Sequence, residues 1–347
     1  MKKHQGTFAS VMLILGTVIG AGFASGQEIV VFFAQYGFVS IIFAFLFFIL
    51  FSYGIFEILK YGKFKQKNPD FIKEYPKNCI FDSFEGIIFL IFSSTMIAGA
   101  EQLLTEFVFP LPFKLWSILI LLLAVIISSK GLKWIIATNK ILVPMVVIFS
   151  ILVCALSFFF SPHSDFTLTF DISNFAFLGV SATLYATCNL MVVNKITNDL
   201  SEKLKDKNIK KVAITCGAIL FGLITLIVTA LLLNDNSVLF TSLPMIYLAY
   251  MISKPVGNIY CAVILLCIFT TLTSTFYSLN EGVKLKLKYK KYSIFISAFA
   301  VLILSLFGFD LIIRYSYPLI GALGIILLFS IKNRMTLYSC GEKSCLK

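Results

Sequence analysis

The chain has 347 residues, of which 59% are hydrophobic and only 13% are charged, and its net charge is +12. Soluble domains carry roughly 25% charged residues, so this composition excludes an ordinary soluble protein and indicates an integral membrane protein. We expect the excess of lysine to orient the chain and to attract anionic lipid, and we do not expect it to bind nucleic acid.

Hydrophobic stretches long enough to cross a hydrocarbon layer of about 30 Å recur along the whole chain. We therefore predict an all-α integral membrane protein with ten membrane-spanning helices. In chain order these are residues 8–36, 38–59, 84–109, 115–129, 134–160, 174–193, 212–234, 256–282, 293–308 and 311–331. The apolar stretch 242–253 is too short to span, so we expect an external or re-entrant helix there.

Basic residues are distributed unevenly over the connections between these stretches. All but three of the 29 lysine and arginine residues lie near the termini or on every second connection, and the exceptions are Lys114, Lys254 and Arg314. Because cytoplasmic loops collect basic residues, this alternation predicts an even number of spans and two cytoplasmic termini. The first span imitates a cleaved signal peptide, but its removal would place every following basic loop on the wrong side, so we expect it to be retained.

The predicted spans divide into two halves of nearly equal length. We assign residues 1–160 to a first five-helix repeat, 161–173 to an external connector, 174–332 to a second five-helix repeat and 333–347 to a cytoplasmic tail. Because five is odd, the second half must begin on the opposite side of the membrane. Inverted repeats are typical of secondary transporters, in which corresponding interrupted helices form the binding site.

The first span contains the glycine-rich and polar stretch GTVIGAGFASGQE at residues 16–28. Its small-xxx-small spacing is consistent with close packing of membrane helices. The alternative is an unwound segment whose amides and carbonyls line a cavity. Glu28 is the last residue of this stretch, so it either meets a substrate ammonium or a coupling proton from the outer vestibule, or reaches the outer membrane interface.

The sixth span is where an inverted repeat predicts the second interrupted helix. Its sequence SATLYATCNLMVVNKI, residues 181–196, places polar side chains in the middle of an apolar helix but contains no glycine or proline. We take Tyr185, Thr187 and Asn189 as candidates for solute binding. The alternative for these side chains is hydrogen bonding between buried helices.

The eighth span carries a run of hydroxyl groups in FTTLTSTFYSLNE, residues 269–281. Thr270, Thr273, Ser274 and Tyr277 share one face at helical spacing. Serine and threonine hydroxyls readily bond back to the preceding turn of their own helix, which is the simpler interpretation. A hard cation needs oxygen ligands, however, and free carbonyls of the first span facing these hydroxyls would supply them.

Several of these motifs carry a family resemblance. GTVIGAG in the first span, IFEILKYGK at 55–63, SKGLKW and KILVP within 129–144, and LTST at 272–275 resemble the LeuT-type fold of the amino acid–polyamine–organocation superfamily. The longer stretch GTVIGAGFASGQE is similar to the uncharacterised bacterial YkvI membrane-protein family. The resemblance covers essentially the whole chain and implies 5+5 inverted repeats with broken helices 1 and 6, in a multi-pass protein of the bacterial inner membrane.

The resemblance also implies binding residues. It implies a sodium site formed by the carbonyls of Gly16, Ile19 and Thr270 and by the hydroxyls of Thr273 and Ser274. It further implies that the amides of Ala21 and Gly22 face a substrate anion. Sodium symporters of this fold have an asparagine where this chain has Phe23 and a gating arginine where it has Gly26, so at most one sodium site is supported.

These observations predict a cation-coupled secondary transporter of a small organic solute that works by alternating access with sodium as the coupling ion and no other cofactor. The resemblance favours an amino-acid-like solute. Proton coupling is an alternative, although Lys140, a lysine within the fifth span, is expected at the inner edge of the membrane. A non-transporting nutrient receptor of the germinant-receptor type is another. An enzyme is not expected, because the chain has no nucleotide-binding or hydrolase motif and its histidines, His4 and His163, lie outside the predicted spans.

Overall fold

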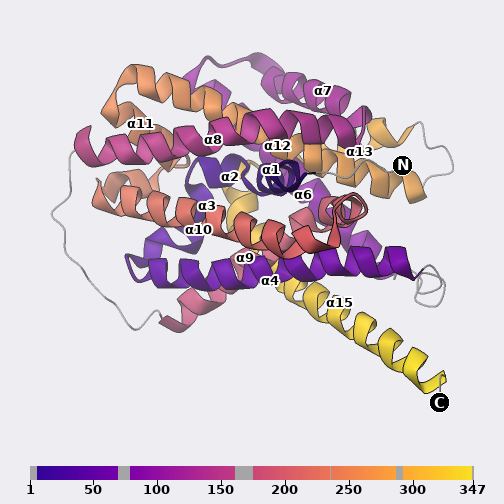
Figure 1. Ribbon diagram of the computed structural model, residues 1–347. Coiled ribbons are helices and arrows are strands. Elements are labelled where there is room, and N and C mark those ends of the chain that lie inside the picture. Colours follow the sequence, from indigo (N-terminus) through magenta and orange to yellow (C-terminus); the bar gives the residue numbers. More distant parts are fainter. Residues whose placement is uncertain (1–5, 69–78, 161–174, 235, 287–291, 346–347) are drawn as a thin grey trace.

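The computed structural model describes residues 6–68, 79–160, 175–234, 236–286 and 292–345. All regular secondary structure within these segments is helical. Figure 1 shows most of the long helices running side by side in one bundle, while the last helix leaves the bundle toward the C-terminus. The all-helical class predicted from composition is therefore confirmed for the described part of the chain.

Seven apolar segments of the described chain are long enough to cross a membrane. They are α4 (Ser40–Lys67), α6 (Cys79–Phe107), α8 (Leu132–Phe160), α9 (Phe175–Ser201), α10 (Ile209–Leu233), α12 (Lys254–Lys286) and a last segment made of α14 (Phe309–Leu311), a π-helical turn (Ile312–Ser316) and α15 (Tyr317–Cys345). Shorter apolar helices occupy the positions of the other predicted spans, namely α1 (Thr7–Val18), α7 (Leu115–Ser129) and α13 (Ser293–Ser305). The count of ten spans and the 5+5 repeat stay predictions.

The connections hold short helical turns. These are η1 (Ala34–Tyr36), η2 (Pro112–Lys114), η4 (Asp206–Asn208), η5 (Asn236–Phe240) and the longer α11 (Pro244–Ile252), which lies inside the stretch predicted as a short helix. The predicted connector 161–173 lies outside the described residues. The residues assigned to the tail continue α15 as a helix to Cys345.

The first span is interrupted, as predicted, and it is interrupted twice. The helix α1 ends at Val18, a single turn α2 (Ala21–Ala24) follows, and α3 (Gln27–Phe32) comes after a second break. Between α2 and α3, Gly26 adopts φ +84°, in the left-handed region where a side chain is strained. The glycine-rich sequence therefore breaks the helix and does more than allow neighbouring helices to approach.

The sixth span is not interrupted, so the prediction of a second broken helix is wrong. The helix α9 runs without a break from Phe175 to Ser201. Two of its polar side chains bond within the helix: the Thr183 hydroxyl donates to the carbonyl of Gly179 at 2.7 Å, and the Asn189 amide donates to the carbonyl of Tyr185 at 2.9 Å. Because residues 181–196 contain no glycine or proline to open the backbone, such bonds leave the helical ladder intact.

The broken first span lies in the interior of the bundle. Every residue of α1 from Ser10 to Val18 is buried, and so is every residue of α2. The helix α1 packs against α8, α9, α10 and α12, and α2 packs against α6 and α12. This surrounding shell is what must satisfy the backbone groups that the two breaks release.

Candidate functional site at the helix breaks

Two main-chain carbonyls near the end of α1 point at a side chain of α12. The hydroxyl of Thr271 lies 3.0 Å from the carbonyl oxygen of Gly16 and 3.0 Å from that of Ile19. A hydroxyl has one proton and can donate fully to only one of them. The three oxygens therefore form a converging, fully buried cluster that is rich in acceptors.

Asn139 on α8 adds a further polar group beside this cluster. Its side chain is fully buried and lies against Gly16, where a Cβ atom would come within 2.9 Å of the Asn139 amide. The amide nitrogen is 3.5 Å from the hydroxyl of Ser274, and the amide oxygen has no hydrogen-bond partner. A buried acceptor without a partner is costly unless a ligand or an ion satisfies it.

The remaining residues of the sodium site implied by the resemblance lie in the next turn of α12. The carbonyl of Thr270 accepts hydrogen bonds from the hydroxyls of Thr273 and Ser274, both at 3.0 Å. Gly16 and Ile19 are thus brought to α12 as expected, but the hydroxyl that reaches their carbonyls is that of Thr271. Ser274 faces the same region through its contact with Asn139.

Ala21 and Gly22, the predicted anion-facing residues, begin the turn that follows the first break. The amide of Ala21 donates to the thioether sulfur of Met96 on α6 at 3.3 Å, which is a weak bond. Gly22 packs against Glu28, because a Cβ atom at Gly22 would lie 2.3 Å from the carboxyl oxygen Oε1. Glu28 is consequently folded back onto α2 and does not extend to the membrane interface.

Glu28 meets two tyrosines from the second half of the chain. The hydroxyl of Tyr185 on α9 donates to Oε2 of Glu28 at 2.8 Å, and the Glu28 side chain is only 3% exposed. The hydroxyl of Tyr317, at the start of α15, also faces Glu28 and Thr95 but makes no hydrogen bond of standard geometry. The structure thereby brings together three predicted residues: Gly22, Glu28 and Tyr185.

The other two predicted residues of the sixth span face elsewhere. The hydroxyl of Thr187 donates to the carbonyl of Gly321 on α15 at 2.6 Å. The amide of Asn189 is bonded to its own helix, at the carbonyl of Tyr185. Neither side chain is directed at the first span in this conformation.

At the second break, groups of α11 and α12 donate hydrogen bonds to the opened backbone. The amide of Met245, in the first turn of α11, donates to the carbonyl of Ser25 at 2.8 Å, and the hydroxyl of Tyr260 donates to the carbonyl of Ala24 at 2.8 Å. Gln27 donates to Asp310 of α14 at 3.2 Å. These bonds tie the outer part of the first span to three later segments of the chain.

Four side chains of this region were not selected from the sequence: Met96, Asn139, Thr271 and Tyr317. Asn139 and Thr271 carried a usable signal, since each is a polar residue within an apolar span and adjoins a residue that was considered. Met96 and Tyr317 carried none, because a methionine or tyrosine in a membrane helix is ordinary packing material.

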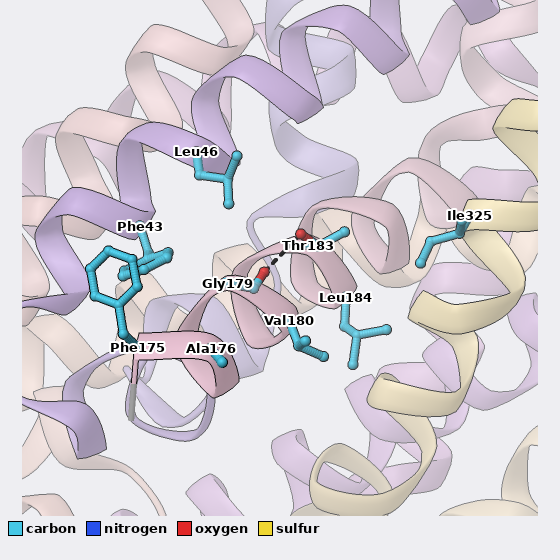
Figure 2. Close-up of a pocket in the computed structure, with 9 residues that line it drawn as sticks. All are labelled: Phe43, Leu46, Phe175, Ala176, Gly179, Val180, Thr183, Leu184 and Ile325. Carbon is cyan, nitrogen blue, oxygen red and sulfur yellow. Dashed lines mark hydrogen bonds between the residues drawn. The ribbon is translucent and has the colours of Figure 1, made fainter. Parts of the chain in front are cut away.

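The structure also contains an apolar groove of about 500 Å³ that is separate from the breaks. Figure 2 shows its lining side chains, which come from α4, α9 and α15 and include Phe43, Phe175, Thr183 and Ile325. Phe175 and Val180 in its wall are about half exposed. The groove therefore lies on the outside of the bundle, where a membrane protein meets lipid, on a different face of α9 from Tyr185.

No protein-family model matches the chain. Two proteins of Bacillus subtilis (strain 168) are similar to it over most of their length. The uncharacterized membrane protein YkvI is 28% identical over 340 residues, covering 92% of this chain and 94% of YkvI. The uncharacterized protein YyaD is 29% identical over 328 residues, with the same two shares. YkvI and YyaD are homologues of this protein.

Solved structures share the fold. MhsT, crystallised in complex with L-phenylalanine, matches with a TM-score of 0.67 at 17% identity, over 94% of this chain and 89% of MhsT. A Na⁺-coupled sialic acid symporter matches with a TM-score of 0.63 at 12% identity, over 96% of this chain and 78% of the symporter. Mhp1, a nucleobase–cation symport transporter with bromovinylhydantoin bound, matches with a TM-score of 0.51 at 15% identity, over 88% of this chain and 74% of Mhp1. The protein therefore has the LeuT-type fold of these structures.

Proposed function

We propose that the protein is a sodium-coupled secondary transporter that moves a small, amino-acid-like organic solute by alternating access. Its fold neighbours support this, because two of them are described as a Na⁺-coupled symporter and a cation-symport transporter. The lysine distribution supports an orientation with both termini in the cytoplasm of a bacterium. The same neighbours favour transport over enzymatic catalysis.

The observation that carries the proposal is the convergence of oxygens at the first break. The carbonyl oxygens of Gly16 and Ile19 each lie 3.0 Å from the hydroxyl of Thr271. Asn139 places an unpartnered amide oxygen in the same buried region. Unwound backbone carbonyls are the groups with which transporters of this kind hold sodium.

The type of oxygen favours a monovalent cation. The oxygens of Gly16, Ile19, Thr271 and Asn139 belong to neutral carbonyls, a hydroxyl and an amide, whereas divalent cations in proteins are usually held by carboxylates. The described residues contain no group of three or more histidine, cysteine or acidic side chains that could hold a metal ion. We therefore assign the sodium ion to the cluster formed by Gly16, Ile19, Thr271 and Asn139. The alternative sodium site is the one implied by the resemblance, which uses Thr270, Thr273 and Ser274.

The decisive experiment is a sodium titration of the thermal stability of the detergent-purified protein, with potassium or choline holding the ionic strength constant. A ligand that binds the folded state raises its apparent stability by mass action. We expect a saturable, sodium-specific rise in the apparent Tm of the wild type. Thr271→Val, which keeps the shape of the side chain but removes its hydroxyl, is expected to abolish the rise.

Thr273→Val is the matched control, because the Thr273 hydroxyl bonds to its own helix. If Thr273→Val abolished the sodium response and Thr271→Val preserved it, the site implied by the resemblance would replace ours. A wild type without any sodium-specific response would contradict sodium coupling. Sodium binding without sodium-driven solute uptake into proteoliposomes would instead favour a receptor.

A further inference from the structure

Glu28 is one of two buried acidic side chains among the described residues, and it exposes less surface than the other, Glu57. The turn at Gly26 folds Glu28 back over α2, so that its carboxyl group fills the space that Gly22 leaves open. The carboxyl group therefore lies against α2, the single turn between the two breaks. It lies where α2, α9 and α15 meet.

The partners of Glu28 within the described residues are neutral. Tyr185 donates one hydrogen bond to Oε2, and the Tyr317 hydroxyl faces the same carboxyl group. The ion pairs found in the described part of the chain involve other acids, namely Asp199, Asp206 and Glu281. A carboxylate inside a membrane protein is costly unless a cation or several hydrogen bonds compensate for it.

The two tyrosines that face the carboxyl group are packed against other aromatic rings. The ring of Tyr185 packs against Phe32, Phe33 and Phe47, with centroid distances of 4.8, 5.6 and 5.4 Å. The ring of Tyr317 lies 4.5 Å from that of Phe92. Aromatic faces attract organic cations and also pack against their hydrocarbon parts.

This combination suits one chemical class of ligand. An ammonium group on an organic molecule would pair with the Glu28 carboxylate, and its carbon skeleton would contact the rings. A metal ion would need several further oxygens, and the aromatic walls do not offer them. A coupling proton would need polar groups leading to water, whereas the rings of Phe32, Phe33, Phe47 and Phe92 surround the two tyrosines.

We infer that the transported solute carries an ammonium group and that the Glu28 carboxylate binds it, with the hydroxyls of Tyr185 and Tyr317 orienting the carboxylate. This inference rests on the proposed transport function, since it names the class of solute. The left-handed turn at Gly26 and the missing side chain at Gly22 are then parts of the recognition site, because both are needed to bring Glu28 against α2.

The test compares matched probes on the purified full-length protein at fixed sodium concentration and pH. The probes are the proteinogenic amino acids, the amines that result from their decarboxylation, and the corresponding carboxylic acids without the amino group. We expect saturable thermal stabilisation by at least one amino acid or amine and none by its deaminated counterpart. In Glu28→Gln, which keeps the size and the hydrogen-bonding ability of the side chain, the apparent Kd of the best probe should rise about tenfold or more.

Two variants guard against an unspecific loss of folding. Gly22→Ala adds a methyl group where the carboxyl group lies and should also weaken the binding of the amine. Glu57→Gln changes the other buried acid and should leave the Kd unchanged. Equal stabilisation by the deaminated acids, no stabilisation by any amine-bearing probe, or an unchanged Kd in Glu28→Gln would each overturn the inference.

A pH-dependent stability that disappeared in Glu28→Gln, without any response to amines, would overturn it in favour of a proton site. A sodium titration without probe separates this inference from the proposed function. If the sodium response persists but no amine binds selectively, only the assignment of the solute is refuted. If amines bind through Glu28 but sodium has no effect, sodium coupling is refuted and the assignment of the solute stands.

Discussion

The first and sixth spans were both expected to be interrupted, but the two helices satisfy their polar groups in opposite ways. The first span opens its backbone at Ile19–Gly20 and again around Gly26. The sixth, α9, keeps its backbone closed, and the Thr183 hydroxyl and the Asn189 amide bond to its own carbonyls. The glycine-rich stretch opens the first span, whereas threonine and asparagine in the middle of α9 do not open the sixth.

An open backbone needs partners from elsewhere, and the structure supplies them. Thr271 faces the carbonyls at the first break, while Tyr260 and the amide of Met245 take those at the second. These partners come from α11 and α12, far along the chain. The broken span therefore depends on later segments of the chain to satisfy its opened backbone, whereas the continuous span satisfies its backbone within its own helix.

We expect the largest loss of stability from a substitution at the contact between α15 and the continuous helix α9. A Cβ atom at Gly321 would lie 2.3 Å from the carbonyl oxygen of Leu184, a backbone atom that cannot move aside without bending α9. Gly321→Ala should therefore destabilise the protein by about 3 kcal/mol, at the upper end for overpacking. The measurement is the apparent Tm in detergent.

Gly222 supplies the matched control for this substitution. It lies within α10, and a Cβ atom there would meet nothing within 4 Å. Gly222→Ala should leave the apparent Tm unchanged or raise it slightly, since alanine favours a helix more than glycine does. Equal losses in the two variants would show that the contact between α9 and α15 is not what limits stability.

We expect a smaller loss of stability from removing one hydrogen-bond donor to the broken span. Tyr260→Phe deletes the hydrogen bond to the carbonyl of Ala24 at 2.8 Å and the contact with Ser150 at 3.3 Å. An unsatisfied buried carbonyl costs about 1–2 kcal/mol. The apparent Tm should fall accordingly, and amide hydrogen exchange should increase in α2 and α3. Unchanged exchange in these segments would mean that Tyr260 does not hold the break.

The sequence was sufficient for some of this architecture and insufficient for the rest. Composition and hydropathy predict an all-helical membrane protein, and the glycines predict the interruption of the first span, because both signals are local. The continuity of α9 was missed because polar residues in mid-helix have two outcomes. The choice between them depends on whether glycine or proline opens the backbone, and residues 181–196 contain neither.

The candidate site shows the same limit at the level of single residues. The resemblance implied hydroxyls at Thr273 and Ser274, whereas Thr271 reaches the carbonyls of the first break; the fifth span was considered for Lys140, whereas its neighbour Asn139 lies at the break. One residue along a helix turns a side chain by about 100°. Short motifs therefore identify the helix that faces a site more reliably than the residue that enters it.

We expect the smallest change in stability from removing a hydroxyl group of the continuous helix α9. This substitution tests the comparison between the broken and the continuous span most directly. Thr183→Val removes a hydroxyl that bonds to the carbonyl of Gly179, as Figure 2 shows. That carbonyl stays in the helical ladder, and the side chain lines an apolar groove, so we expect a change in stability of less than about 0.5 kcal/mol. Thr183→Val and Tyr260→Phe each delete one hydroxyl, but only the second leaves a carbonyl without a substitute donor. If both variants lowered the apparent Tm equally, a continuous helix would depend on its polar side chains as much as a broken one does.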